Sequence, residues 1–209
     1  MGMFVTIEGP EGSGKTTVAK KVVEKLSNEG KKVIYTREPG GVLIAEKIRD
    51  IILDVSNTNL DARCEALLYA ASRRQHLVEK VIPALKDDYI VICDRFIDSS
   101  LAYQGYARDL GVDEVYDINM FAINGQWPDL TILLDIDPEV GLERIMRNRA
   151  NEINRLDLEG LNFHSKVHKG YQIVKEKYAD RITIVNGNKS QDEVFNEVYG
   201  IIQNKLNGI

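Results

Sequence analysis

Residues 9–16 read GPEGSGKT, a run of small residues that ends in a lysine and a threonine. The glycines let the backbone curl so that its N–H groups point inward at phosphate. Lys15 can then reach the β- and γ-phosphates of a nucleotide, and the Thr16 hydroxyl can ligate Mg²⁺. An apolar run precedes this loop and a helix-like segment follows it, which is the context that a true nucleotide-binding loop requires. We therefore expect a nucleotide to bind at Gly9, Pro10, Glu11, Gly12, Ser13, Gly14, Lys15, Thr16 and Thr17.

Charged groups also follow two other apolar runs. TREPGG supplies Arg37 and Glu38 after one run, and Asp94 and Arg95 follow another. In an open α/β sheet, such loops meet at the carboxyl ends of the strands. Two arginines beside a phosphate-binding loop can hold a second phosphate, and Asp94 can hold Mg²⁺ or its waters. The alternative, a surface salt bridge for each arginine, is weakened by their shared position.

The elements that must position these loops alternate along the chain. Unbroken apolar runs are typical of parallel strands covered on both faces, and helical patterns separate them. We predict an α/β fold with a five-stranded parallel sheet and helices on both faces, as a single domain over 1–209. The predicted strands are 3–8, 32–36, 89–94, 130–136 and 182–185.

A long helical pattern at 61–86 has two different faces. Its apolar residues at 64, 67, 68, 71, 78, 81, 82 and 85 share one face, and Pro83 is expected to kink or end the helix late. Tyr69 and Arg73, four residues apart, point almost directly away from that stripe. Their face is either solvated or the wall of a pocket, and the pair alone favours the solvated alternative.

A basic segment follows the fourth predicted strand. A helix is expected to begin with Asp137 as its cap and Pro138 at its first position, and it runs into RIMRNRANEINRLD. This segment is either an exposed charged helix end or a mobile lid, at about 144–157, that closes over an anion. Its arginines are Arg144, Arg147, Arg149 and Arg155.

The composition limits the partners and the location. The 209 residues carry a net charge of −5, which makes a general binder of nucleic acid or of anionic membrane unexpected. No apolar segment approaches the roughly 20 residues that span a bilayer, and no targeting segment is recognised. We expect a cytoplasmic protein in which Cys64 and Cys93 are buried free thiols. His164 and His168 are expected on the surface, because no further ligands support a metal site.

The nucleotide-binding loop alone does not separate an ATPase, a GTPase switch and a kinase. A GTPase is disfavoured, because NKSQD at 188–192 misses the guanine-reading spacing N-K-x-D by one residue. The second anion site favours a kinase that acts on a nucleoside monophosphate. A kinase for another nucleotide or a nucleoside, and a non-catalytic nucleotide-binding module, remain as alternatives.

Taken in chain order, GPEGSGKT, TREPGG, YAASRRQH and DRFIDSSLAYQG resemble the thymidylate kinase family, from the first strand to the lid. The resemblance implies a P-loop nucleoside-monophosphate kinase domain that transfers the γ-phosphate of ATP to dTMP, with Mg²⁺ as cofactor. It also implies a homodimer built from helix faces, and packing of the loop at 185–190 against adenine. Gly12 stands where some members carry an arginine, so the likeness is to bacterial-type members with arginines in the lid.

The same resemblance implies roles for single residues. Arginines would hold the dTMP phosphate, Tyr69 would stack on thymine, and Tyr103 would lie against the sugar and disfavour a ribose hydroxyl. Base contacts would come from Arg73, Ser100 and Gln104. The residues implied in acceptor binding are Glu11, Arg37, Glu38, Arg49, Tyr69, Arg73, Arg95, Ser100, Tyr103 and Gln104. The implied catalytic residues are Lys15, Arg95 and one lid arginine, for which Arg149 precedes Arg155 and Arg147.

Overall fold

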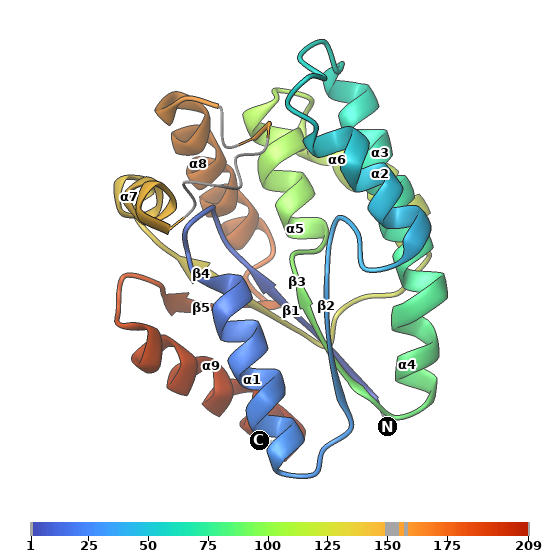
Figure 1. Cartoon of the computed structure of the whole chain (residues 1–209), viewed down its shortest axis with the longest axis vertical. Coiled ribbons are helices and arrows are strands. Elements are labelled where there is room, and N and C mark those ends of the chain that lie inside the picture. Colours follow the sequence, from blue (N-terminus) through green and yellow to red (C-terminus); the bar gives the residue numbers. More distant parts are fainter. Residues whose placement is uncertain (1, 149–154, 157–158, 209) are drawn as a thin grey trace.

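In the computed structural model of the chain, five strands form one parallel sheet with the order β2-β3-β1-β4-β5 (Figure 1). The structure describes residues 2–148, 155–156 and 159–208. All five predicted strands are confirmed in these residues, with ends shifted by at most one position. They are β1 (Met3–Glu8), β2 (Val33–Arg37), β3 (Ile90–Asp94), β4 (Leu130–Asp135) and β5 (Ile182–Asn186).

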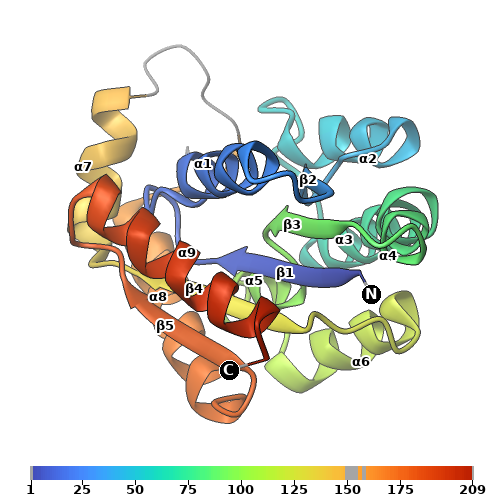
Figure 2. The same ribbon diagram turned by 90° about the horizontal axis from the view of Figure 1, so that it is seen from below.

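Helices cover both faces of the sheet, as predicted (Figure 2). On one face, α1 (Lys15–Asn28) and α9 (Gln191–Leu206) pack on Val5 and its neighbours. Phe4, the preceding residue, belongs to the core on the other face. Because adjacent residues of β1 serve opposite cores, the strand is an unbroken apolar run. The second layer comprises η1 (Leu77–Val81), α4 (Ile82–Lys86), α5 (Ile97–Ser100), η2 (Leu101–Ala107), α6 (Val112–Ile123) and α8 (Leu161–Lys177).

The strand register gathers the carboxyl ends of β1, β2 and β3 at one edge. Asp94, the last residue of β3, pairs with Ile7 of β1 on one side and with Arg37 of β2 on the other. Since β1 lies between β3 and β4, the loop that follows it stands near the middle of this edge. The three charged loops predicted from the sequence therefore meet.

The helical pattern at 61–86 forms α3 (Ala62–His76), the π-helical turn η1 and α4 in succession. Asp61 begins α3 by accepting hydrogen bonds from two backbone N–H groups of the first turn. The widened turn lies just before Pro83, which lacks a backbone donor, and it stands where a late kink was expected. Helix α2 (Leu43–Leu53) packs alongside α3.

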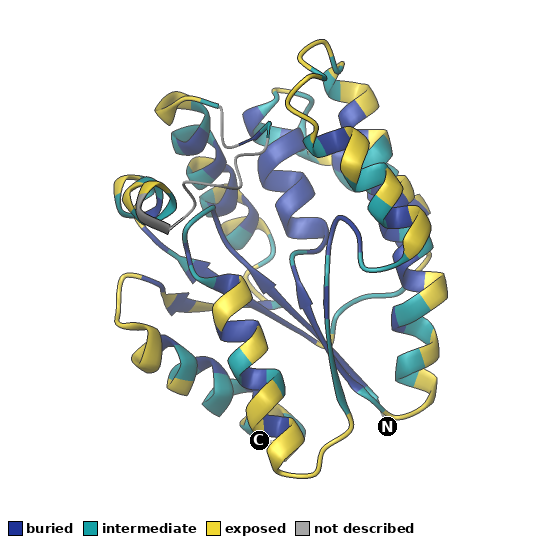
Figure 3. Ribbon diagram, viewed as in Figure 1, coloured by how far each residue is buried: buried dark blue, intermediate teal, exposed yellow. Residues whose placement is uncertain are grey.

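The burial of α3 differs from the predicted pattern (Figure 3). Cys64 is exposed, so the expectation of a buried thiol is wrong, and Leu67 is 57% exposed. Arg73, on the opposite side of the helix, is buried, and Tyr69 is half-buried. The solvated alternative for that side is therefore wrong, because α3 turns polar residues inward.

The region after β4 begins as predicted. Helix α7 (Pro138–Asn148) starts at Pro138, and the carbonyl oxygen of Asp137 accepts a hydrogen bond of 3.0 Å from a backbone N–H within it. His164 of α8 is buried, so its expected surface position is wrong, whereas His168 is partly exposed and lies 3.3 Å from Asp135. Within the described residues, no helix has both the length and the apolar composition needed to cross a membrane.

Candidate active site

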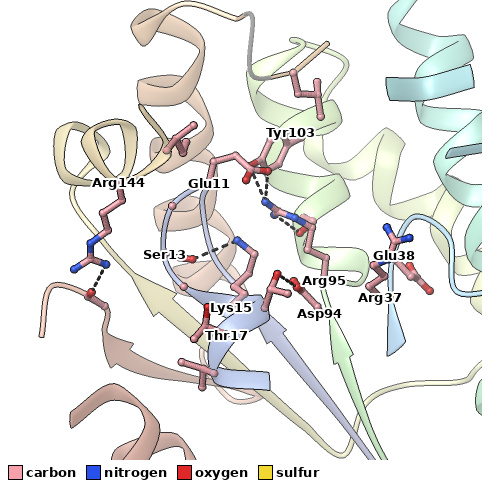
Figure 4. Close-up of a pocket in the computed structure, with 18 of the residues that line it drawn as sticks. Glu11, Ser13, Lys15, Thr17, Arg37, Glu38, Asp94, Arg95, Tyr103 and Arg144 are labelled. Atoms are coloured by element: carbon pink, nitrogen blue, oxygen red, sulfur yellow. Dashed lines mark hydrogen bonds and ion pairs between the residues drawn. The ribbon is translucent and has the colours of Figure 1, made fainter. Parts of the chain in front are cut away.

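The loop between β1 and α1 wraps around the ammonium group of Lys15 (Figure 4). Nζ donates to the carbonyl oxygen of Pro10 at 2.8 Å and contacts Ser13 Oγ at 3.3 Å. Burial, together with the positive charge of Arg95, lowers the pKa of Lys15 to about 8. Phosphate at this loop would favour the charged ammonium, so Lys15 is suited to bind it.

Gly12 lets the loop lie directly on α7. Its φ of +75° falls in the left-handed region that favours glycine. A Cβ at Gly12 would come within 2.2 Å of the carbonyl oxygen of Gly141, and a Cβ at Gly141 would lie 2.7 Å from that of Glu11. The phosphate loop and the helix that leads into the basic segment therefore touch through a pair of glycines.

A cavity of about 620 Å³ opens at the carboxyl ends of the strands. Its volume is typical of small-molecule sites, which span roughly 300–1,000 Å³. The phosphate loop lies between two lobes: Arg144 of α7 contacts the Gly187 carbonyl oxygen at 3.0 Å on one side, and α2, α3 and η2 line the other. Of the predicted site residues, those in the lining are Glu11, Gly12, Ser13, Gly14, Lys15, Thr16, Thr17, Arg37, Glu38, Arg49, Tyr69, Asp94, Arg95, Tyr103 and Gln104.

Arg95 is held between the phosphate loop and the acceptor lobe, which is the part of the cavity lined by α2, α3 and η2. Its φ of +71° is uncommon for a residue with a side chain. One terminal nitrogen donates to the Gly9 carbonyl oxygen at 3.0 Å and to the Tyr171 hydroxyl at 3.2 Å. The other donates to Glu11 at 2.5 Å and to the Tyr103 hydroxyl at 3.3 Å. These contacts fix the guanidinium in one orientation.

Glu8, the last residue of β1, supports Arg95 through two hydroxyl groups. Ser99 Oγ donates to Glu8 at 2.6 Å and the Tyr171 hydroxyl does so at 3.2 Å. Both hydroxyls also accept hydrogen bonds from Arg95. Burial, with the charge of nearby Asp98, raises the pKa of Glu8 to about 7. The sequence analysis did not single out Glu8, because it ends the apolar run MFVTIE. A carboxylate at the end of a buried strand nevertheless indicates a polar partner or a functional site nearby.

Thr16 and Asp94 place oxygen ligands side by side. The Thr16 hydroxyl donates to Asp94 Oδ2 at 2.5 Å, and the Tyr35 hydroxyl lies 3.5 Å from the same oxygen. Mg²⁺ takes oxygen ligands and is usually held by one or two protein groups, with water and substrate phosphates completing its shell. The donor set at this edge of the phosphate loop fits Mg²⁺.

Arg37 and Arg49 line the cavity beside Arg95. One terminal nitrogen of Arg37 donates to both carboxylate oxygens of Glu46, at 2.9 and 3.0 Å. Arg49 donates to the Pro39 carbonyl oxygen at 3.1 Å. Burial and the positive charge of Arg37 lower the pKa of Arg49. Three guanidinium groups thus converge on one lobe, which suits it to a second anion.

The inner wall of this lobe offers an aromatic face and an amide. Tyr69 of α3 and Gln104 of η2 line the cavity. Arg73 and Ser100 are not in the lining: Arg73 donates to Ser100 Oγ at 3.1 Å and to Glu38 at 2.7 Å behind it. The structure therefore brings Tyr69 and Gln104 to the cavity surface and places Arg73 one layer deeper.

The predicted lid lies only partly within the described residues. Arg149, the first choice for a catalytic lid arginine, lies outside them, as does the side chain of Arg147. Arg155 donates from Nε to the Ile52 carbonyl oxygen at 2.9 Å and from a terminal nitrogen to Glu65 at 2.5 Å. Arg155 therefore contacts the wall formed by α2 and α3.

A phosphate loop at the centre of a parallel sheet, with arginines converging at the neighbouring strand ends, defines the class of P-loop kinases. The family model of thymidylate kinase matches residues 7–198. The chain belongs to the thymidylate kinase family, as the sequence resemblance implied.

Individual relatives support this assignment over nearly the whole chain. The chain is 60% identical over 202 residues to a thymidylate kinase of Clostridium novyi, covering 97% of this chain and 98% of the relative. It is 55% identical over 207 residues to a thymidylate kinase of a Geobacillus species, covering 99% of each. The crystal structure of thymidylate kinase from Ehrlichia chaffeensis superimposes with a TM-score of 0.77 at 32% identity, covering 96% of this chain and 98% of that one.

Proposed function

We propose that this chain transfers the γ-phosphoryl group of ATP to dTMP, which forms dTDP and ADP for dTTP synthesis. It is an enzyme of the thymidylate kinase family, and its reaction is the phosphorylation of dTMP to dTDP. The chain acts as one P-loop kinase domain over 1–209. The observation that carries the proposal is the position of Arg95, which contacts the phosphate loop at Gly9 and also lines the acceptor lobe with Tyr69.

On the donor side, the loop at 9–17 holds the ATP phosphates, with Lys15 at the β- and γ-phosphates. Adenine lies against the loop that follows β5, where Arg144 and Gly187 line the cavity. Thr16 and Asp94 hold Mg²⁺ or its water ligands. When bound there, Mg²⁺ would supply positive charge to the phosphate oxygens.

On the acceptor side, Arg95 and Arg37 bind the dTMP phosphate, with Arg49 beside them. Tyr69 supplies the stacking face for thymine, and Gln104 contacts its N3. Tyr103 lies against C2′ of the sugar. Glu11 meets either the sugar 3′-hydroxyl or the arginine cluster, and its 2.5 Å contact with Arg95 supports the second role. Arg73 donates to O4 and Ser100 lies near N3. Both residues lie behind the cavity wall, so these contacts require the wall to move locally when the base binds.

Catalysis follows from positioning and charge stabilisation. The acceptor is already a phosphate oxygen, so the transfer requires no strong general base. Closure of the lid, about 144–157, brings Arg149 to the transferring phosphoryl group and keeps out water that would hydrolyse ATP. Arg155 and Arg147 are the next choices for this role.

We also propose a cytoplasmic homodimer. Large apolar side chains are exposed on three neighbouring helices: Leu43 of α2 at 70%, Leu67 of α3 at 57% and Phe121 of α6 at 91%. Covering such side chains in a second copy of the chain would stabilise a dimer. Cys64 is exposed and Cys93 is buried, and both are free thiols, as is usual in a reducing compartment.

The test is ADP formation from ATP and Mg²⁺ with dTMP, dUMP, UMP, dCMP and thymidine offered separately. We expect dTMP to be turned over best, and Arg95→Ala to abolish that turnover. Arg63→Ala, which removes an exposed guanidinium from α3, is the matched control and should remain active. Turnover of thymidine but not dTMP would indicate a nucleoside kinase, and ATP binding without any turnover would indicate a binding module.

A further inference from the structure

Glu65 is a buried carboxylate beside the acceptor lobe that the proposed reaction does not use. It lies in the first turn of α3, is 1% exposed and precedes Tyr69 by about one helical turn. Its Oε1 accepts a hydrogen bond from Nε2 of Gln104 at 2.8 Å, and its Oε2 accepts one from Arg155 at 2.5 Å. Arg108 lies 3.5 Å from the same carboxylate.

This arrangement determines which end of the Gln104 amide faces Glu65. A carboxylate between two guanidinium groups carries a negative charge and only accepts hydrogen bonds, so it must face the amide NH₂ group. The carbonyl oxygen of Gln104 is then the end of the amide that a ligand can meet. Gln104 lines the cavity together with Tyr69, the proposed stacking face.

We infer that Glu65 is a specificity-determining residue: it holds the Gln104 amide so that a carbonyl oxygen, and not an NH₂ group, meets the acceptor base. This inference rests on the proposed function, in which Gln104 contacts N3. Thymine and uracil carry a hydrogen at N3 that donates, whereas cytosine carries a lone pair there. A fixed carbonyl oxygen therefore binds dTMP and dUMP, and in dCMP it opposes a second acceptor in a buried site.

The substitution Glu65→Gln removes this constraint and keeps the shape of the side chain. The new amide can donate to the Gln104 carbonyl as readily as it accepts from the NH₂ group. Gln104 can then turn over and donate to N3 of cytosine. We expect the ratio of kcat/KM for dTMP to kcat/KM for dCMP to fall at least about tenfold. The ratio for dTMP to dUMP should stay within about twofold, because both bases donate at N3.

A matched control separates the effect of Glu65 on base specificity from the effect of its ion pair with Arg155, a residue of the predicted lid. Arg155→Met removes one of the two guanidinium partners of Glu65 and leaves the Gln104 contact in place, so it should change kcat/KM for dTMP and dCMP alike. Because Glu65→Gln leaves Arg155 without its ionic partner, the double variant is measured as well. Thermal unfolding confirms that each variant is folded. The same lowered ratio is expected in the single and the double variant.

The outcomes distinguish this inference from the proposed function. Equal losses for dTMP and dCMP in Glu65→Gln would overturn the inference and leave Glu65 a structural role. Gln104→Leu tests the reading of the base itself. If that variant lowers the preference for dTMP while Glu65→Gln does not, Gln104 reads the base without Glu65. If neither variant changes the ratio of kcat/KM for dTMP to kcat/KM for dCMP, Gln104 does not contact the base. The proposed position of Gln104 at N3 and the inference about Glu65 are then both wrong.

Discussion

The Thr16 hydroxyl and the Asp94 carboxylate lie 2.5 Å apart, although 78 positions separate them in the chain. The first belongs to the start of α1 and the second ends β3, so the parallel pairing of β1 with β3 is what joins them. Both offer oxygen to a hard cation next to Lys15. The sheet thus assembles the proposed metal position from the start of a helix and the end of a strand.

Asp94→Asn should weaken the binding of Mg²⁺ at the active site. The substitution removes the negative charge and leaves the side chain nearly the same size, so we expect kcat to fall on the order of 10²-fold and half-saturation to need more Mg²⁺. Tyr35→Phe, which removes only the hydroxyl near the same carboxylate, is the control. Initial rates against Mg²⁺ concentration measure both, and an unchanged Mg²⁺ dependence in Asp94→Asn would exclude this role.

Glu8 should make the stability depend on pH. Its pKa is about 7 in the folded chain against an ordinary 4.5. Between these values the folded chain keeps a proton that the unfolded chain has released, so the free energy of unfolding decreases as pH rises and levels off above 7. The total decrease from this group is on the order of 3 kcal/mol.

Glu8→Gln should remove that slope and keep the hydrogen bonds, because the hydroxyls of Ser99 and Tyr171 can accept as well as donate. Urea unfolding of both proteins at pH 5, 6, 7 and 8 measures the difference. The variant should gain stability relative to the parent as pH rises. Parallel curves for the two proteins would show that Glu8 does not titrate in this range.

Arg149→Ala should lower kcat strongly. An arginine that stabilises the transferring phosphoryl group is worth about 10³-fold or more in rate, while ATP binding depends chiefly on the loop at 9–17. We expect KM for ATP to change little. Arg155→Ala should have the smaller effect on kcat, because Arg155 contacts Ile52 and Glu65. A larger loss of kcat in Arg155→Ala than in Arg149→Ala would reverse the assignment.

Leu67→Glu should produce a monomer. The change puts a charge among the exposed apolar side chains of α2, α3 and α6, where a partner would bury it. Leu161→Glu alters a side chain on α8 that is 48% exposed and lies outside this surface, so it should stay dimeric. Sedimentation velocity reports the mass of each species. A parent protein that sediments as a monomer would refute the proposed dimer.

Local signals explain which features the sequence could predict. The motif ending in Lys15 and Thr16 is contiguous, and each strand is an unbroken apolar run, so the sheet and the phosphate loop were both predictable. Glu8 was not, because its partner Ser99 is 91 positions away and their pairing depends on tertiary packing. The same holds for Glu65 and Gln104.

The pattern of α3 left open whether the side with Tyr69 and Arg73 is solvated or walls a pocket, and the reason is physical. Periodicity identifies a helix with two faces, but it does not say which face meets the interior. Here Arg73 and His76 are buried among polar partners next to the cavity, while Leu67 is exposed. Helix α3 lines a polar site and carries apolar residues on its outer side. It therefore departs from the usual pattern, in which the apolar face of a helix is buried and the polar face is solvated.

The contact between Gly12 and Gly141 restricts the evolutionary routes open to this enzyme. A side chain at position 12 would strike the backbone of α7, so an arginine cannot replace Gly12 unless the helix first moves away. Any lineage that exchanged a lid arginine for a loop arginine would therefore have passed through at least one other change. An ancestor on that route would have needed a shifted α7 before the new arginine could be of use.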